Sequence, residues 1–232
     1  MRMTMMVVML LATAGPALAQ GPYVAATIGG DIVKSTTFTA PGTSSDGGSG
    51  QALSGALRVG GSIAPRFGVE LEWVRAGEIQ ADETGPIYYA TDAQRAAVAG
   101  AVGVPAIADV GILPIISQQT RIRTATLSAL AFARQPIGAR VELVYLGGIG
   151  FSRMTQTITF GVPGRALPAG RGQASYTTAT TQYGQGPVVG FEARVGMTEH
   201  ARLIAGVRLQ GLGQSLVDGW VIRPGVGLGW SF

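Results

Sequence analysis

Cysteine is absent from the 232 residues of this chain, and histidine and lysine each occur once, as His200 and Lys34. The lack of cysteine excludes disulfide bonds, thiolate catalysis and cysteine-ligated metals, and a single histidine disfavours a histidine-based metal site. The 17 basic residues, almost all of them arginine, stand against 13 acidic ones, for a net charge of +4. That charge is too small and too dispersed for a nucleic-acid surface.

Long apolar runs are also missing. Hydrophobic residues make up 47% of the chain and charged residues only 13%, a balance that usually indicates transmembrane helices. After residue 20, however, no segment has the roughly 18 consecutive apolar residues that a membrane-spanning helix needs. The apolar residues alternate with small or polar ones instead, which is how a membrane β-barrel carries its hydrophobic content.

The first twenty residues have the three parts of a secretory signal peptide. Arg2 lies near the start, an apolar run covers residues 5–12, and residues 17–19 (Ala-Leu-Ala) form a small-residue cleavage site. A single membrane anchor is the alternative, but the run is too short for one and is followed by a Gly-Pro pair. We therefore expect residues 1–19 to be a cleaved signal peptide, which leaves one domain over residues 20–232.

The last thirteen residues show the alternation most clearly. Every second residue is apolar, in the row Trp220, Ile222, Pro224, Val226, Leu228, Trp230 and Phe232. A period of two is the period of a β-strand. The apolar face has aromatic residues at both limits, and glycines and Arg223 back it. This pattern predicts a strand whose outer face contacts lipid and whose inner face lines a packed lumen.

The same pattern recurs seven times earlier in the chain. We expect these strands over residues 23–31, 53–64, 67–74, 121–134, 140–153, 188–197 and 201–212. Facing is ambiguous only in 121–134, where we favour the row of alanines and Leu127 as the outward one. Short turns at 65–66, 135–138 and 198–200 alternate with long connections at 34–52, 75–120 and 154–183. In outer-membrane barrels the short turns lie in the periplasm and the long loops outside the cell.

The long connections differ in character. Residues 34–52 are polar and rich in glycine and serine, which predicts a loop outside the membrane. Within 75–120 we expect a short helix over residues 91–99, with Thr91 as its N-cap. The apolar stretch 102–116 either packs as a lid on the barrel rim or contacts a partner or lipid. In 154–183, two alternating segments predict a hairpin above the membrane, with its tip at 161–172.

Together these features predict an all-β fold, an eight-stranded antiparallel transmembrane β-barrel in up-and-down meander order with long extracellular loops. Closure removes the unpaired strand edges that lipid cannot hydrogen-bond. A soluble lipocalin-like barrel, with the apolar rows inside, is the alternative. The rows that would then face water are mostly glycine, serine and alanine, so we favour the membrane barrel.

Charged residues recur on the rows expected to face the lumen. They are Arg58, Glu70, Glu72, Glu142, Glu192, Arg194, Arg208 and Arg223, four of each sign. An unpaired charge in a narrow lumen is costly, so we expect an interior charge network of mutual pairs. Eight strands leave an interior just filled by side chains, which favours a salt-bridged plug. A narrow, gated pathway for ions or small solutes is the alternative.

Catalytic arrangements find little support in the sequence. His200 is expected in a periplasmic turn, away from any substrate in the outer leaflet, which disfavours a Ser-His-carboxylate triad. Glu70 and Glu72 have the residue types of an acid–base pair, but carboxylates beside arginines more often form ion pairs. The glycines at 147, 148 and 150 follow strand periodicity and not that of a phosphate-binding loop. We expect no enzymatic activity, no metal site and no cofactor.

The architecture resembles the small outer-membrane β-barrel family that includes opacity-porin-like proteins and the OmpA-type transmembrane domain. The resemblance covers residues 22–232 and rests on residues 23–30 (Tyr-Val-Ala-Ala-Thr-Ile-Gly-Gly), the glycine-rich strands and the terminal aromatic residue. In that family the barrel-assembly machinery reads a C-terminal phenylalanine preceded by apolar residues at alternate positions. The matching residues here are Val226, Leu228, Trp230 and Phe232.

The resemblance implies a location in the outer membrane of a Gram-negative bacterium. It implies contacts with outer-membrane lipid and lipopolysaccharide, with the assembly machinery during biogenesis, and with extracellular partners through the loops. The expected function is envelope integrity and the display of surface loops for adhesion. We expect no peptidoglycan-binding domain after Phe232, so the resemblance does not imply a wall-anchoring role.

Overall fold

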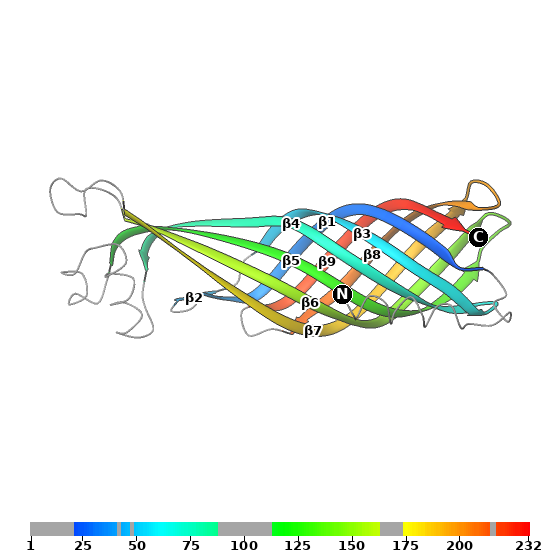
Figure 1. The fold of residues 1–232 in the computed structure, drawn as a ribbon, viewed down its shortest axis with the longest axis horizontal. Coiled ribbons are helices and arrows are strands. Elements are labelled where there is room, and N and C mark those ends of the chain that lie inside the picture. Colours follow the sequence, from blue (N-terminus) through cyan, green and yellow to red (C-terminus); the bar gives the residue numbers. More distant parts are fainter. Residues whose placement is uncertain (1–20, 41–42, 47–48, 88–112, 163–173, 214–216) are drawn as a thin grey trace, which may run out of the picture.

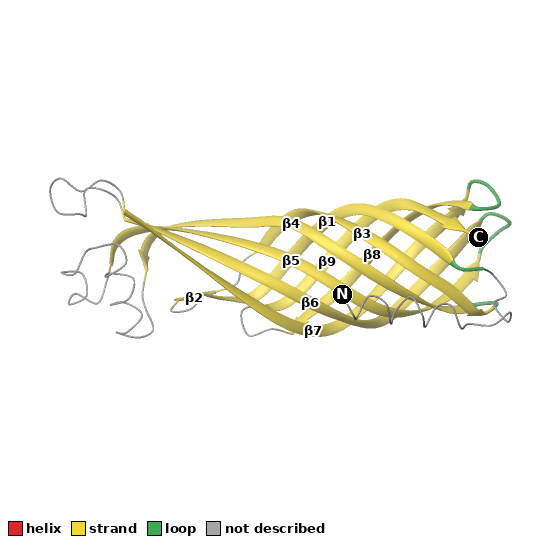
Figure 2. Ribbon diagram, in the orientation of Figure 1, coloured by secondary structure: helices red, strands yellow, loops and turns green. Residues whose placement is uncertain are grey.

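The computed structural model describes residues 21–40, 43–46, 49–87, 113–162, 174–213 and 217–232. Nearly all of these residues are in β-strands joined by short turns (Figure 2). The expected signal peptide and the expected helix at 91–99 lie outside the described residues, as does most of the apolar stretch 102–116. No helix among the described residues has the length and apolar character that crossing a membrane requires.

The described chain forms nine strands. They are β1 (Tyr23–Ala40), β2 (Thr43–Asp46), β3 (Ser49–Ala64), β4 (Phe67–Ile87), β5 (Leu113–Pro136), β6 (Val141–Val162), β7 (Ala174–Gly196), β8 (Ala201–Gly213) and β9 (Val217–Ser231). The short β2 pairs only with the far end of β1, so it belongs to the first connection and not to the barrel wall.

The remaining eight strands close into a barrel (Figure 1). Each pairs antiparallel with its neighbour in the chain, and β1 pairs with β9 from Tyr23↔Ser231 to Phe38↔Val217. The backbone groups in the wall are therefore paired from strand to strand, as a membrane requires. The predicted eight-stranded antiparallel meander is confirmed.

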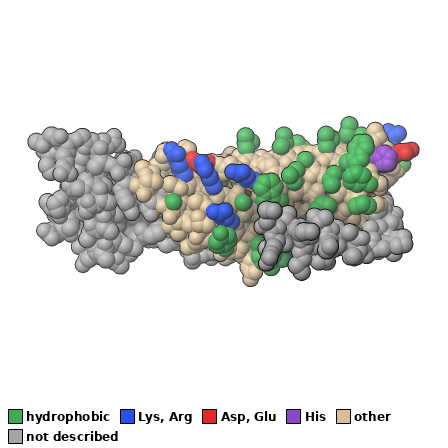
Figure 3. Space-filling model, viewed as in Figure 1, with side chains coloured by type: hydrophobic (Ala, Val, Ile, Leu, Met, Phe, Trp, Pro, Cys, Tyr) green, Lys and Arg blue, Asp and Glu red, His purple; other side chains and the backbone are tan. Residues whose placement is uncertain are grey.

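Side chains alternate between the two faces of the wall as predicted. The ambiguous strand 121–134 is settled, because Leu127 is 47% exposed on the outside whereas Phe132 is 3% exposed inside. The closing strand turns Trp220, Val226, Leu228 and Trp230 outward. Figure 3 shows hydrophobic side chains distributed over the outer surface of the barrel. A barrel with this surface is suited to lipid and not to water.

The lumen holds two apolar clusters as well as polar groups. One comprises Tyr23, Ala25, Leu130, Phe132, Val144, Leu146, Val188 and Ile204. The other lies nearer the long connections and comprises Val33, Ile79, Ile122, Met154, Leu212 and Val221. The barrel interior is thus a packed core and not an open channel.

Two of the predicted loops are largely strand, which corrects the sequence prediction. Within 34–52, β1 extends to Ala40 and β3 begins at Ser49, with Lys34 paired to Ser49. Within 75–120, β4 and β5 continue until Ile87 pairs with Leu113. Sequence reasoning ended these strands where their apolar rows end. An apolar row marks contact with lipid, however, and strand pairing continues beyond the membrane without one.

The connection 154–183 has the predicted form of a hairpin. β6 and β7 remain in register from Val141↔Val195 to Val162↔Ala174. Since β4, β5, β6 and β7 are 21, 24, 22 and 23 residues long, whereas β8 and β9 have 13 and 15, the four long strands form a sheet that extends past the others (Figure 1). We call this extension the projecting sheet.

Close backbone approach explains one glycine of the pair at 147 and 148. A Cβ at Gly148 would lie 2.0 Å from the carbonyl oxygen of Ala129 and 2.9 Å from the Cα of Leu130, whereas a Cβ at Gly147 would meet nothing within 4 Å. The two positions are adjacent in β6 and therefore form a matched pair.

We expect Gly148→Ala to lower the free energy of unfolding by about 1–3 kcal/mol, because the neighbouring backbone must move. Gly147→Ala should change it by less than about 0.5 kcal/mol. Urea unfolding of the barrel in lipid vesicles, followed by loss of the fast-migrating folded band in unheated gel samples, measures both. Equal effects of the two substitutions would contradict the close approach.

Candidate functional site

Six buried charged side chains meet in the lumen and form what we call the interior charge cluster. They are Arg58 on β3, Glu70 and Glu72 on β4, Glu192 and Arg194 on β7, and Arg208 on β8. In the closed strand order, β3 lies across the lumen from β7 and β4 lies across from β8. The three arginines and three glutamates therefore join opposite walls of the barrel.

Arg208 contacts all three carboxylates. Its Nη2 atom lies 2.9 Å from Glu192 Oε1, 3.3 Å from Glu70 Oε1 and 3.4 Å from Glu72 Oε2. The side chains involved are at most 4% exposed. Arg208 thus forms ion pairs with all three carboxylates of the cluster.

Arg58 and Arg194 complete the charge balance. Arg58 reaches across the lumen to Glu192 and places its Nε 3.0 Å from Glu72 Oε2. Arg194 places its Nη2 2.8 Å from Glu192 Oε2 and 3.3 Å from Glu70 Oε2. Each carboxylate therefore has at least two arginine partners, which offsets the cost of removing the charges from water.

Tyr23 is part of the same cluster. Its hydroxyl group donates a hydrogen bond to Glu70 Oε2, and the guanidinium of Arg194 lies 5.1 Å from the centre of its ring. Arg194 also lies 5.6 Å from the Phe132 ring. These aromatic faces hold Arg194 in place through cation–π contacts.

The two other charges on the predicted list lie apart from the cluster. Arg223 forms a bidentate pair with Asp31, at 2.6 and 2.8 Å. Glu142 accepts a hydrogen bond from Arg202 at 2.6 Å, near the mouth beside the short turns. The structure therefore divides the eight predicted residues into a six-membered cluster and two separate pairs.

Four interior residues were missed from the sequence: Tyr23, Asp31, Arg134 and Arg202. Tyr23 and Asp31 occupy the inward row of β1, and Arg202 the inward row of β8, so the alternation itself could have identified them. Arg134 donates to Ser62 Oγ and to the carbonyl oxygen of Pro65. It follows Phe132 on the same row of β5 and could have been found in the same way.

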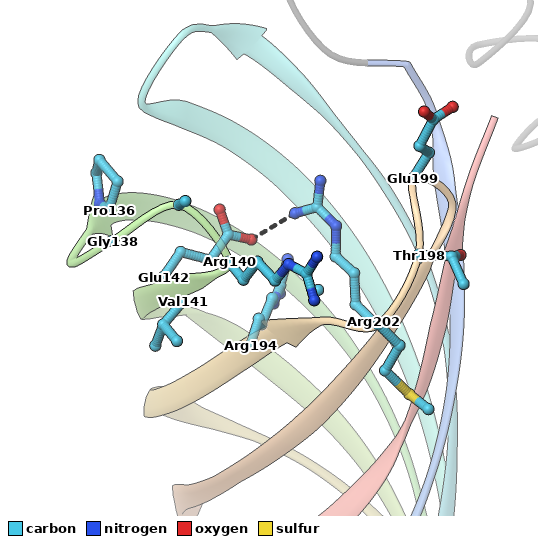
Figure 4. Close-up of a pocket in the computed structure, with 12 residues that line it drawn as sticks. Pro136, Gly138, Arg140, Val141, Glu142, Arg194, Thr198, Glu199 and Arg202 are labelled. Atoms are coloured by element: carbon cyan, nitrogen blue, oxygen red, sulfur yellow. Dashed lines mark hydrogen bonds and ion pairs between the residues drawn. The ribbon is translucent and has the colours of Figure 1, made fainter.

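A large cavity lies at the mouth of the barrel beside the short turns. There a cavity of about 520 Å³ is lined by Arg140, Glu142, Glu199 and Arg202 and reaches Arg194 of the cluster (Figure 4). Beside the cluster, two further cavities have only about 20 Å³ each. A space of that size holds about one water molecule. The cluster therefore separates the mouth from the rest of the lumen.

The three residues weighed as catalytic candidates in the sequence, His200, Glu70 and Glu72, are engaged in other contacts. His200 stacks on Trp230 with ring centres 5.5 Å apart, and its Nδ1 lies 3.0 Å from the Ser231 carbonyl oxygen. Glu70 and Glu72 are engaged by arginines. Among the described residues, no three side chains of His, Cys, Asp and Glu are grouped as metal ligands.

The outward row of the closing strand β9 is exposed at the barrel surface. Val226, Leu228, Trp230 and Phe232 are 48–69% exposed. Phe232 extends past β9, and its backbone N–H donates to the Pro22 carbonyl oxygen at 3.1 Å. The role of these four residues as an assembly signal remains a prediction.

A closed eight-stranded barrel with an apolar outer surface and mutually paired charges inside is typical of one class of membrane protein. The chain is a transmembrane β-barrel of the outer-membrane type. No family model matches the sequence, and no curated protein matches it either.

Solved structures of outer-membrane barrels are similar in fold. Neisserial surface protein A (NspA) superposes with a TM-score of 0.55 at 14% identity, over 91% of this chain and 97% of that one. OprG from Pseudomonas aeruginosa gives a TM-score of 0.48 at 12% identity, over 92% of this chain and 96% of that one. At these identities the similarity to NspA shows a shared fold alone. The resemblance drawn from the sequence is confirmed at that level.

The charge balance of the cluster can be tested at Arg208. Arg208→Met leaves three buried carboxylates with two arginines, and we expect it to lower the free energy of unfolding by about 3–5 kcal/mol. Arg202→Met, at the partly exposed pair with Glu142, should cost about 1 kcal/mol or less. Urea unfolding in lipid vesicles measures both variants.

A compensating change separates charge from packing in this test. Arg208→Met combined with Glu72→Gln restores equal numbers of cations and anions, so part of the lost stability should return. If the double variant is no more stable than Arg208→Met alone, the electrostatic explanation is wrong.

Proposed function

We propose that this protein is a non-enzymatic outer-membrane barrel that supports envelope integrity and displays the projecting sheet outside the cell for adhesion. The observation that carries the proposal is strand length. A transmembrane β-strand needs about 9–11 residues, and β4 to β7 have 21 to 24. About ten or more residues of each strand are therefore left over beyond the membrane.

Side-chain chemistry along the projecting sheet supports this assignment. Thr155 and Thr181 join β6 to β7 with hydroxyl groups 3.1 Å apart, and Thr159 and Thr177 do the same further out. Both contacts are on exposed faces. Rows of threonine form cross-strand hydrogen bonds and suit water rather than lipid.

The packed lumen favours a supporting role over transport. The interior charge cluster joins opposite walls, which stiffens the barrel beneath the projecting sheet. A small gated channel is the second candidate, favoured by the polar cavity of about 520 Å³ at the mouth. For that function Arg194 would have to leave Glu70 and Glu192.

The proposed partners follow from the surfaces that the barrel presents. Outer-membrane lipid and lipopolysaccharide would surround the apolar band. The assembly machinery would read the outward row that ends at Phe232, and an extracellular partner would contact the projecting sheet. The similarity to NspA bears on the fold and leaves each of these partners to experiment.

Display outside the cell can be tested by cysteine labelling, since the chain has no cysteine of its own. We expect Thr177→Cys, on the outer part of β7, to react with a membrane-impermeant maleimide on intact cells. Val189→Cys, on the apolar outer face of the same strand, should be protected by lipid. Glu199→Cys, in the turn after β7, should react only once the outer membrane is permeabilised.

The three positions form a series along one strand and its turn, so each controls for the others. Heat-modifiable gel migration establishes that every variant is folded. Labelling of Glu199→Cys but not Thr177→Cys on intact cells would reverse the orientation and end the display proposal.

The channel alternative can be separated by conductance. We expect the folded barrel to show no conductance steps in planar bilayers, because the cluster closes the lumen. Conductance steps that change in size with Arg58→Ala or Glu142→Ala, but not with Arg66→Ala in the exposed turn, would favour the channel instead.

A further inference from the structure

A second group of arginines lies on the outside of the barrel. Arg75, Arg121, Arg123 and Arg153 come from β4, β5 and β6 and are exposed on the outer face. We call them the arginine belt. Figure 3 shows basic side chains gathered between the hydrophobic side chains of the barrel and its grey end. The arrangement places cations where the apolar surface stops.

The belt carries excess positive charge. Glu78 is the carboxylate that forms ion pairs with it in the described part of the chain, 2.7 Å from Arg123 Nη2 and 3.4 Å from Arg121 Nε. Glu78 lies beyond the apolar band, where hydrogen bonds from Gln80 and Arg123 hold the pKa of its carboxyl group below its ordinary value. One carboxylate cannot neutralise four guanidinium groups. Within the described chain, Arg75 and Arg153 have no ion-pair partner.

An apolar groove lies directly beside the belt. This cavity of about 550 Å³ on the barrel exterior is lined by Trp73, Leu127 and Phe151, with Arg153 and Tyr183 at one side. Trp73, Leu127 and Phe151 occupy one register row across β4, β5 and β6. The groove is therefore a hollow in the surface that contacts lipid.

The next register row explains the hollow and its charge. Arg75 pairs with Ala125, Ala125 with Arg153, and Arg153 with Tyr183. The small side chain of Ala125 thus lies between two arginines that are two strands, or about 10 Å, apart. Two cations flank a gap that opens onto an apolar groove.

Depth in the membrane fits a lipid headgroup. From the short-turn end, Arg153 lies 12 residues beyond Val141 in β6, and Arg123 lies 13 residues before Pro136 in β5. A strand crosses the bilayer in about 9–11 residues, so both arginines lie just past the apolar band. Arg75 lies only eight residues beyond Phe67 in β4, in the outer part of the band, and its long side chain can extend toward the headgroups.

We propose that the arginine belt and the adjoining groove bind a phosphorylated, multiply acylated lipid of the outer leaflet. Arg75 and Arg153 bind the phosphate groups, and Trp73, Leu127 and Phe151 contact an acyl chain. Arginine suits this role because its planar guanidinium donates paired hydrogen bonds to phosphate, and basic pockets on membrane proteins recognise anionic headgroups. The site deepens the proposed function, on which it rests, by assigning a residue set to the lipid partner.

Binding can be measured with diphosphoryl lipid A as the probe, titrated into the full barrel in zwitterionic detergent micelles. Native mass spectrometry gives the apparent Kd. Arg75→Gln combined with Arg153→Gln should weaken binding by more than about ten-fold, since two charge-assisted contacts are lost. Arg66→Gln combined with Arg140→Gln removes the same charge from the short turns and should leave the Kd unchanged.

A third variant distinguishes a lipid from a soluble anion. Ala125→Trp fills the groove and keeps the arginines, so it should weaken lipid A binding. Inorganic pyrophosphate, which carries phosphates but no acyl chain, should bind much more weakly than lipid A to the unaltered barrel. Pyrophosphate binding as tight as that of lipid A, with no effect of Ala125→Trp, would overturn the lipid assignment.

Equal loss of affinity in the belt and short-turn variants would also overturn the proposal, because it would reduce the effect to net charge. Heat-modifiable migration and the labelling series at Thr177, Val189 and Glu199 are read on the same variants. A failure of the proposed display function shows in the labelling series, whereas a failure of the lipid site shows only in the Kd.

Discussion

The pairing of β1 with β9 is the constraint on which the rest of the structure depends. Lipid offers no hydrogen bonds to a strand edge, so a spanning sheet must close on itself. Pairing of β1 with β9 from Tyr23↔Ser231 to Phe38↔Val217 makes that closure, with a register shift between Ser35 and Thr37. Closure at eight strands then fixes a lumen that side chains fill. Both the alternation of residues and the crowding of charges inside follow from this geometry.

Inside the closed wall, buried charges of both signs lie within a few ångströms of one another and must neutralise each other. Three arginines and three glutamates from opposite sides of the barrel neutralise one another, with Arg208 shared among the three carboxylates. Such a cluster adds little to the stability of the fold compared with an apolar core of the same shape. Removing one of its charges, however, is strongly destabilising, because it leaves another buried charge unpaired. It also ties together strands that are far apart in sequence, from Arg58 to Glu192. The barrel is stiffened where the wall alone could shear.

The sequence contained the barrel wall almost entirely, because a period of two with an apolar row determines both strand and facing. It located Glu70, Glu72 and Arg208 inside for the same reason. It did not reveal that Glu142 pairs with Arg202 apart from the cluster, since partner choice depends on how the strands are staggered around the barrel. Nor did it reveal how far β4 and β5 continue. Beyond the bilayer the apolar row that marks a strand has no reason to persist.

The unequal strand lengths carry a further consequence. In the barrel wall the sheet is closed and has no edge strand, whereas the projecting sheet has two. In the described chain β4 pairs beyond Ala76 with β5 alone, and β7 before Gln185 pairs with β6 alone. In the part of the chain that the structure describes, the outer segments of β4 and β7 are therefore edge strands, each with a partner strand on one side only. An edge strand can accept a further strand from another polypeptide, so the fold that closes on itself in the barrel wall leaves two open edges in the projecting sheet.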